Sequence, residues 1–328
     1  MSRHAAKSSL VNTRDVVMHK MRKKVWERAL GSRALELYEP RVRVKVELLM
    51  SKIVAAEGSP INVTKYFMYF SFDVMADTQL TGFSKDFCML ESTSYHPAIQ
   101  GIHRTMSFIG ILSTVPWLIY MVGSIPGLTT YNLFSRWCRD EVNEKRKFGH
   151  FETLVMDTVK EPQDIMSWLL KAPPSKRAVE EDARLLLIAG SDTSAGVLTN
   201  ALYLLASNPH CYRKLQAKVQ EQFPGGISQW TYEGAKAIPY IDHVIHETMR
   251  LRPIVPGGMP RTVPPQGILI DGQFIPGGTI ATVPTYTIQR DERYWEDPLV
   301  FKPERWEGSI QGSGSHSLVA KEANANHG

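Results

Sequence analysis

Three polar side chains that could bind or move protons lie together in the stretch A-G-S-D-T, which runs from Ala189 to Thr193. Asp, Ser and Thr side chains compete with the backbone for hydrogen bonds, so an acid between two alcohols is costly inside an apolar helix. One interpretation is that Ser191 or Asp192 caps a new helix that begins there. The other is a helix opened locally at Gly190, in which the Thr193 hydroxyl faces a cavity as a proton relay and Asp192 supplies the protons.

A second candidate pair is Glu247 and Arg250, which are three residues apart in the stretch E-T-M-R. Residues at this spacing meet on one face of a helix, where an exposed ion pair contributes only about 0.2–0.5 kcal/mol. Glu181 and Arg184 have the same spacing. The spacing alone therefore does not separate a functional pair from a solvated one.

The third candidate is the segment F-K-P-E-R-W, which runs from Phe301 to Trp306 and places Arg305 beside aromatic residues. Its simplest interpretation is a surface loop that begins at Pro303. A guanidinium can, however, bind a carboxylate through two hydrogen bonds. A carboxylate such as Glu247, if buried, would need a partner of this kind.

The elements that must position these residues are mainly helical as far as residue 260. Apolar residues recur at helical spacing between Asp15 and Leu30, which predicts an amphipathic helix. A long apolar helix is expected around residues 182–206. Asn208 and Pro209 predict the cap and the first position of the next helix. Residues 239–251 form a further expected helix.

The pattern changes after Pro253, because prolines at 253, 256, 260, 264 and 265 exclude a regular helix. Asp271-Gly272, flanked by apolar runs, predicts a two-residue hairpin. Residues 279–283 are a further strand candidate. The expected fold class is mainly α with a small β region. We expect a single domain over residues 1–306, followed by a disordered Gly-, Ser- and Asn-rich tail over 307–328.

The charge of the chain is concentrated at its N-terminus. Residues 1–50 hold 12 Lys and Arg against 5 Asp and Glu, whereas the remaining residues hold 26 against 28. This distribution favours one local anionic partner and argues against a general nucleic-acid binder. Three widely spaced cysteines, Cys88, Cys138 and Cys211, argue against a disulfide framework or a structural zinc site and favour a reducing compartment.

One stretch, residues 105–135, carries no charge and is long enough to span a membrane. Pro116 and Pro126 interrupt it, so a buried or membrane-dipping helical hairpin is favoured over a continuous span.

In combination, these motifs resemble those of a cytochrome P450, a haem-thiolate monooxygenase, of the fungal microsomal type. The resemblance runs from about Val16 to Trp306 and rests on A-G-x-D-T, on the E-x-x-R pair and on P-E-R-W. The early stretch H-K-M-R-K at residues 19–23 supports it. The fold that it implies is the cytochrome P450 fold, incomplete here.

The resemblance implies a role for each motif. Asp192 and Thr193 would be catalytic, on the oxygen side of haem b, where they deliver protons. Haem and a separate NADPH-cytochrome P450 reductase would be the cofactor and the electron source. The remaining site residues would be a structural triad of Glu247, Arg250 and Arg305, and the propionate-facing positions His19, Lys23 and Arg261. The basic N-terminus would then face haem propionates or an acidic reductase surface.

The sequence departs from the family after Trp306, where the pattern F-x-x-G-x-x-x-C-x-G has no counterpart. No metal ligand is therefore assigned, since the axial cysteine is absent. The family's N-terminal membrane anchor also has no counterpart, so we expect a chain cut at both ends and inactive as it stands.

The implied reaction is insertion of one oxygen atom from O₂ into a hydrophobic small molecule in fungal secondary metabolism. The alternative is a non-catalytic interaction or lipid-binding protein derived from this fold. The family implies the endoplasmic reticulum membrane, and a peripheral or cytoplasmic location is the expectation without the anchor.

Overall fold

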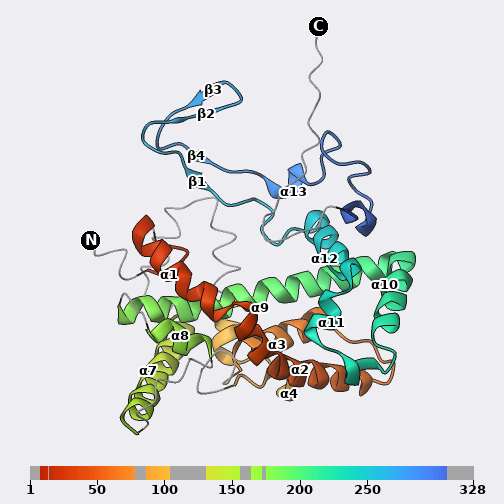
Figure 1. Cartoon of the computed structure of the whole chain (residues 1–328), viewed down its shortest axis with the longest axis horizontal. Coiled ribbons are helices and arrows are strands. Elements are labelled where there is room, and N and C mark those ends of the chain that lie inside the picture. Colours follow the sequence, from red (N-terminus) through yellow and green to blue (C-terminus); the bar gives the residue numbers. More distant parts are fainter. Residues whose placement is uncertain are drawn as a thin grey trace. The chain divides into compact units, whose positions relative to one another are not determined.

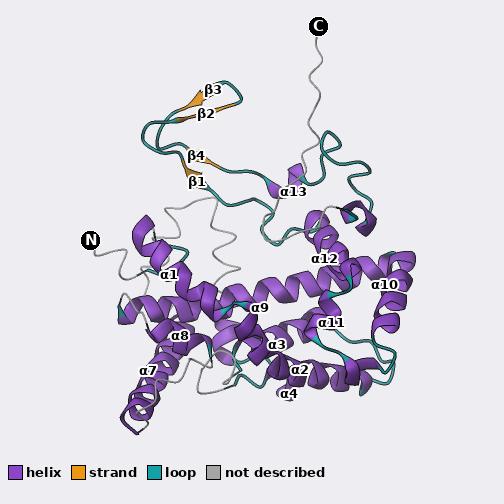
Figure 2. Ribbon diagram, viewed as in Figure 1, coloured by secondary structure: helices purple, strands orange, loops and turns teal. Residues whose placement is uncertain are grey.

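A computed structural model describes residues 8–13, 15–77, 86–103, 131–155, 164–171 and 175–308 (Figure 1). Helices predominate as far as Leu251, and the first described strand begins at Arg261 (Figure 2). The predicted mainly α fold class with a small β region is confirmed. The chain divides into two compact units, Met1–Ala195 and Gly196–Gly328, which are described separately.

The first unit is helical throughout its described residues. Its helices are α1 (Val16–Ala29), α2 (Ser32–Val54), α3 (Val63–Met75), α4 (Met89–Ser92), an unlabelled helix over 97–103, α7 (Tyr131–Val155), α8 (Ile165–Lys171) and the first part of α9 (Lys176–Ser207). α2 packs on α3, and α1 packs on α8. The core between them is rich in fully buried aromatic and aliphatic side chains, among them Phe72, Phe134 and Ile99.

Local side chains fix where two of these helices begin. The Asp15 carboxylate accepts a hydrogen bond from the Met18 N–H at 3.0 Å, and the Asn62 side-chain oxygen accepts one from the Lys65 N–H at 3.0 Å. Each bond satisfies one of the N–H groups that a helix leaves unpaired in its first turn. The prediction of a helix between Asp15 and Leu30 is confirmed.

The second unit combines helices with two short sheets. Its helices are the end of α9, α10 (Pro209–Gln222), α11 (Tyr232–Lys236), α12 (Pro239–Leu251) and α13 (Thr285–Ile288), with 3-10 turns η2 (Gly226–Gln229) and η3 (Pro303–Trp306). α12 packs on η3, α10 and α11. The core around α12 includes Tyr240, Val244 and Phe301, and each of these side chains is buried.

The predicted hairpin is present as β2 (Ile268–Ile270) paired antiparallel with β3 (Gln273–Ile275). Its two turn residues both have positive φ, 48° at Asp271 and 74° at Gly272, as a two-residue hairpin turn requires. The second sheet pairs β1 (Arg261–Thr262) with β4 (Ile280–Ala281), which lies within the strand predicted for residues 279–283.

Two local predictions are wrong in part. Pro209 does open α10, but the Asn208 side chain does not cap it. Its amide instead donates to the Leu204 carbonyl at 2.8 Å, and so closes the preceding helix. The highly charged stretch 141–147 predicts a solvated helix face, but Glu141, its first residue, is only 3 % exposed on α7.

Within the described residues, α9 alone is long and apolar enough to cross a membrane. Core helices of soluble proteins meet the same criteria, so α9 is weak evidence for a span. The uncharged stretch 105–135, predicted as a buried or membrane-dipping hairpin rather than a continuous span, lies outside the described residues as far as 130, and its last residues begin α7. The tail predicted as disordered lies outside them from residue 309.

Candidate functional site

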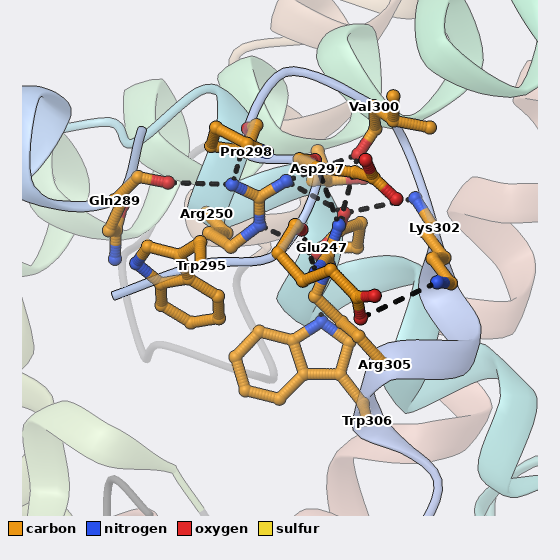
Figure 3. Close-up of polar contacts among 12 residues, drawn as sticks. Glu247, Arg250, Gln289, Trp295, Asp297, Pro298, Val300, Lys302, Arg305 and Trp306 are labelled. Atoms are coloured by element: carbon orange, nitrogen blue, oxygen red, sulfur yellow. Dashed lines mark hydrogen bonds and ion pairs between the residues drawn. The ribbon is translucent and has the colours of Figure 1, made fainter. Parts of the chain in front are cut away.

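The carboxylate of Glu247, on α12, is the centre of a buried polar network (Figure 3). Its side chain is 0 % exposed and accepts two hydrogen bonds from Arg250, both at 2.9 Å. Arg305, on η3, donates its Nε–H to Oε1 at 3.0 Å. The structure therefore brings together Glu247, Arg250 and Arg305, the three residues of the implied triad.

Arg250 has every one of its five N–H donors paired. Nε and one donor of Nη2 bind the Glu247 carboxylate, as described above. The other three donors bind backbone carbonyls, at 2.6 Å to Gln289, 2.7 Å to Pro298 and 3.2 Å to Val300. A guanidinium that is 1 % exposed can remain charged at low cost only when its donors are satisfied in this way.

The segment around η3 closes the network from the other side. The Trp306 indole N–H donates to Glu247 Oε2 at 3.0 Å, and the Lys302 backbone N–H donates to Oε1 at 3.0 Å. Arg305 also donates to the Glu296 carbonyl at 2.8 Å. P-E-R-W is therefore a 3-10 turn held by α12, and not the simple surface loop that its composition suggests.

Burial by itself would raise the pKa of Glu247, because it removes water from the charged form. The hydrogen bonds from Arg250 and from the Lys302 N–H favour the charged form and outweigh burial. The pKa of Glu247 consequently lies below its ordinary value of 4.5. The carboxylate is therefore held in its charged form by hydrogen-bond donors on both of its oxygens.

The same segment carries a contact that the sequence analysis missed. Glu304 accepts hydrogen bonds from Lys214 at 2.8 Å and from the Tyr240 hydroxyl at 3.0 Å. Lys214 also lies over the Tyr240 ring, 4.6 Å from its centroid. These contacts join η3 to both α10 and α12. No spacing rule could have found them, because the three residues come from three distant parts of the sequence.

The A-G-S-D-T stretch lies inside α9, which is continuous from Lys176 to Ser207. Both interpretations of its backbone are therefore wrong, since no helix begins at Ser191 and none opens at Gly190. The two alcohols find carbonyl acceptors instead. Ser191, which is fully buried, donates to the Ser71 carbonyl at 3.4 Å, and the Thr193 hydroxyl donates to the Ala189 carbonyl one turn earlier.

The Asp192 side chain also contacts a residue outside α9. Its Oδ1 lies 3.0 Å from Nε2 of His103, which belongs to helix 97–103, and the two side chains are 32 % and 30 % exposed. The sequence analysis did not single out His103. The only signal was a histidine at the edge of an uncharged stretch, and many unrelated positions would share it.

Gly190 has a packing role in the same stretch. A Cβ built there would meet Met75 of α3 at 2.6 Å from Cε and 2.8 Å from Sδ. The missing side chain therefore lets α3 approach α9 closely. Gly190 thus allows α3 and α9 to pack closely, and α9 stays a continuous helix at this position.

The three implied propionate contacts are placed as follows. Lys23 forms an ion pair with Glu27 at 3.3 Å on the exposed side of α1, one turn further along that helix. His19, also on α1, is partly exposed. Arg261, on β1 of the second unit, is exposed and donates to the Pro260 carbonyl at 3.1 Å. Each is accessible to an anion, and their contact with a propionate stays a prediction.

None of the three cysteines has the environment that a thiolate ligand of haem iron would need. Cys138 and Cys211 are fully buried, and burial raises the pKa of both thiols. Burial also raises the pKa of Cys88, the exposed one. A thiolate ligand needs an environment that lowers its pKa. The described residues also hold no group of three or more His, Cys, Asp or Glu side chains suited to a metal ion.

A second buried ion pair was not anticipated at all. Arg22 of α1 binds Asp182 of α9, with side chains 4 % and 5 % exposed. Arg22 also donates to the Ser8 carbonyl at 2.7 Å, and the Leu10 N–H donates to Asp182 at 2.8 Å. One cation of the basic N-terminus is thus used inside the first unit. The available signal was an acid near the start of an apolar helix.

Comparison with known proteins gives matches that all belong to one family. A family model described as "Cytochrome P450" matches residues 2–318. "Cytochrome P450 monooxygenase eupD" of Phoma sp is 47 % identical over 215 residues, which cover 62 % of this chain and 74 % of that protein. "Cytochrome P450 monooxygenase orf5" of Eupenicillium brefeldianum is 36 % identical over 308 residues, which cover 92 % and 59 %.

"Tryprostatin B 6-hydroxylase" of Aspergillus fumigatus is 33 % identical over 314 residues, which cover 91 % of this chain and 53 % of that protein. The solved structure titled "Crystal structure of cytochrome P450DA heme domain" superposes with a TM-score of 0.72 at 21 % identity, covering 87 % of this chain and 60 % of that one. Apart from eupD, these relatives are matched over little more than half of their own length.

Proposed function

Because this chain belongs to the cytochrome P450 family, we propose that it serves a monooxygenase that inserts one oxygen atom from O₂ into a hydrophobic small molecule. One observation carries the proposal. A family match over residues 2–318 contains both the buried Glu247 network and the Asp192–Thr193 pair. Relatives named as monooxygenases or as a hydroxylase, matched over nine-tenths of this chain, support the reaction class.

The proposal gives the residues distinct tasks. The Asp192 carboxylate and the Thr193 hydroxyl are the proton-handling groups. Glu247, with Arg250 and Arg305, holds α12 and η3 together and takes no part in the reaction. The cofactor is haem b, which the family implies, with His19, Lys23 and Arg261 as contacts of its propionates. None of the three cysteines is assigned to its iron.

The proposed partners follow from the family and from the relatives. A separate NADPH-cytochrome P450 reductase supplies electrons, and the exposed cations of α1 are its candidate contact. Hydroxylation of tryprostatin B, named for one relative, supports fungal secondary metabolism as the setting. The endoplasmic reticulum membrane is the proposed location, with peripheral association through apolar surface as the alternative.

Gene deletion under isotope-labelled O₂ tests this function in the intact organism. We expect deletion to remove a metabolite that carries one labelled oxygen atom and to accumulate its apolar precursor. The wild-type gene should restore the metabolite, and Thr193→Ala should not. Ser194→Ala is the matched control, because it removes the neighbouring exposed alcohol of the same helix and should restore the metabolite fully.

Two results would overturn the proposal. Deletion that leaves every labelled metabolite unchanged would exclude oxygen insertion. Full rescue by Thr193→Ala, in a strain where deletion has a phenotype, would favour the non-catalytic interaction or lipid-binding protein.

A further inference from the structure

His103 has a contact geometry that its place in the sequence does not explain. It lies in the described part of helix 97–103 of the first unit, and its Nε2 lies 3.0 Å from Oδ1 of Asp192 on α9. Both side chains are about one-third exposed, so the pair lies at the edge of the packed core. The contact joins two helices that are 89 residues apart in the sequence.

Aromatic side chains fix the plane of the His103 ring. The Phe72 ring lies 5.8 Å from it at 67°, and the Tyr95 ring lies 5.7 Å from it at 85°, both in edge-to-face orientation. Phe72 is itself fully buried in the core of the first unit. The ring therefore packs against Phe72 and Tyr95, and its Nε2 faces Asp192.

Asp192, in contrast, has little that would hold it from within its own helix. A partly exposed Asp on a helix samples several rotamers and can turn toward nearby backbone groups. A donor fixed on another helix selects one of these rotamers. His103 supplies such a donor, because its position is set by Phe72 and Tyr95 and not by Asp192.

We propose that His103 is the positioning residue for Asp192, holding its carboxylate in a single orientation and tying helix 97–103 to α9. This inference rests on the proposed function, and it deepens that function by naming what orients the proton-handling acid. Asp192 needs such a positioning group because a proton donor acts only from the right distance and direction.

The charges around the pair are consistent with this geometry. Burial raises the pKa of Tyr95 most, and the neighbouring Tyr69 and the negative charge of Asp192 raise it further. Tyr69, whose ring is 5.0 Å from that of Tyr95, comes from α3, and Lys65 of the same helix partly offsets these charges at Tyr95. The charge of Asp192 therefore acts on Tyr95, one of the two aromatic side chains that hold the His103 ring.

Two substitutions of His103 separate its hydrogen bond from its packing. His103→Phe keeps the aromatic ring against Phe72 and Tyr95 and removes the N–H donor. His103→Gln loses the ring and keeps an N–H at nearly the position of Nε2. Asp192→Asn removes the charge from the other side of the contact.

The first measurement uses the ring nitrogen resonances of His103 in the full 328-residue chain. We expect the Nε2 resonance to show a hydrogen-bonded N–H and to change in Asp192→Asn. The buried ring of His243, in the second unit, should not change and serves as the internal control. An unchanged His103 resonance in Asp192→Asn would overturn the proposal.

The second measurement is rescue of the isotope-labelled metabolite in the deletion strain. We expect His103→Phe to lower its yield by roughly 10-fold or more, and His103→Gln to recover most of it. Equal yields from the two variants would show that His103 acts through packing and would overturn the proposal. If the wild-type gene itself yields no labelled metabolite while the ring resonance responds to Asp192→Asn, the proposed reaction fails and the tie between His103 and Asp192 stands.

Discussion

α9 and α12 each carry a Glu and an Arg three residues apart, but the two pairs differ in how far the carboxylate is buried and in what else binds it. On α9, Arg184 donates its Nε–H to Glu181 at 3.2 Å, and the Glu181 side chain is 28 % exposed. On α12, the Glu247 side chain is 0 % exposed and accepts bonds from Arg250, Arg305, Trp306 and the Lys302 backbone. The motif becomes a structural centre only where later segments of the chain cover it.

The pair Arg22–Asp182 shows that burial alone is not the difference. Its side chains are almost as buried as those of Arg250 and Glu247. Asp182 nevertheless accepts fewer bonds, chiefly from Arg22 and the Leu10 N–H, and burial raises its pKa above the ordinary value of 3.8. At Glu247 the donors outweigh burial and the pKa is lowered. The number of donors therefore decides the sign of the shift.

The largest expected effect breaks the α12 network directly. Arg250→Met should lower the free energy of unfolding by about 3–5 kcal/mol, because it removes the counter-charge and two donors from a buried carboxylate and one donor from each of three carbonyls. Arg184→Met is the matched control on α9. It should cost about 1 kcal/mol or less, because Glu181 can reach water. Urea unfolding of both variants measures the difference, and similar losses would remove the distinction between the two pairs.

The next effect concerns the buried pair of the first unit. Arg22→Met should cost about 3 kcal/mol, because it strands the charge of Asp182 in the core. The double variant Arg22→Met/Asp182→Asn should regain part of this loss, because Asn needs no cation. Thermal and urea unfolding test the non-additivity. Strict additivity of the two substitutions would mean that the ion pair contributes nothing beyond its separate side chains.

The contributions of Glu247 and Asp182 to the free energy of unfolding should change in opposite directions as the pH falls. A lowered pKa means that Glu247 contributes stability above its unfolded value of 4.5, which is lost as the pH falls through the folded value. A raised pKa gives Asp182 the opposite slope, since its contribution is complete below 3.8 and is lost as the pH rises through the folded value.

Unfolding free energies of the wild type, Glu247→Gln and Asp182→Asn between neutral and acid pH measure these slopes. The advantage of the wild type over Glu247→Gln should shrink on acidification, and its advantage over Asp182→Asn should change in the opposite direction. Two slopes of the same sign would contradict the donor-count explanation.

These contrasts also explain what could be read from the sequence. The contact between the α12 motif and P-E-R-W could be predicted because the family resemblance implies it. The 55 or more residues that separate Glu247 from its partners there leave no local pattern that would predict this contact. The hairpin at Asp271-Gly272 followed from local turn chemistry alone. Arg22–Asp182 and His103–Asp192 depend on which distant helices pack together, and no local pattern records that. The continuity of α9 through Ser191 and Thr193 depends on their hydroxyl acceptors, of which the Ser71 carbonyl comes from another helix.

The smallest expected effect concerns the packing of α9 on α3. At Gly190 these two helices are in close contact, without a charged network like that of α12. Gly190→Ala gains about 1 kcal/mol of helix propensity but places a methyl group 2.6 Å from Met75 Cε. Met75 is flexible and only partly buried, so we expect the gain and the strain to cancel nearly. In a Met75→Ala background the strain is absent, and Gly190→Ala should then stabilise the chain by about 1 kcal/mol. A thermodynamic cycle from urea unfolding measures this coupling. The same effect of Gly190→Ala in both backgrounds would show that the glycine does not set the approach of the two helices.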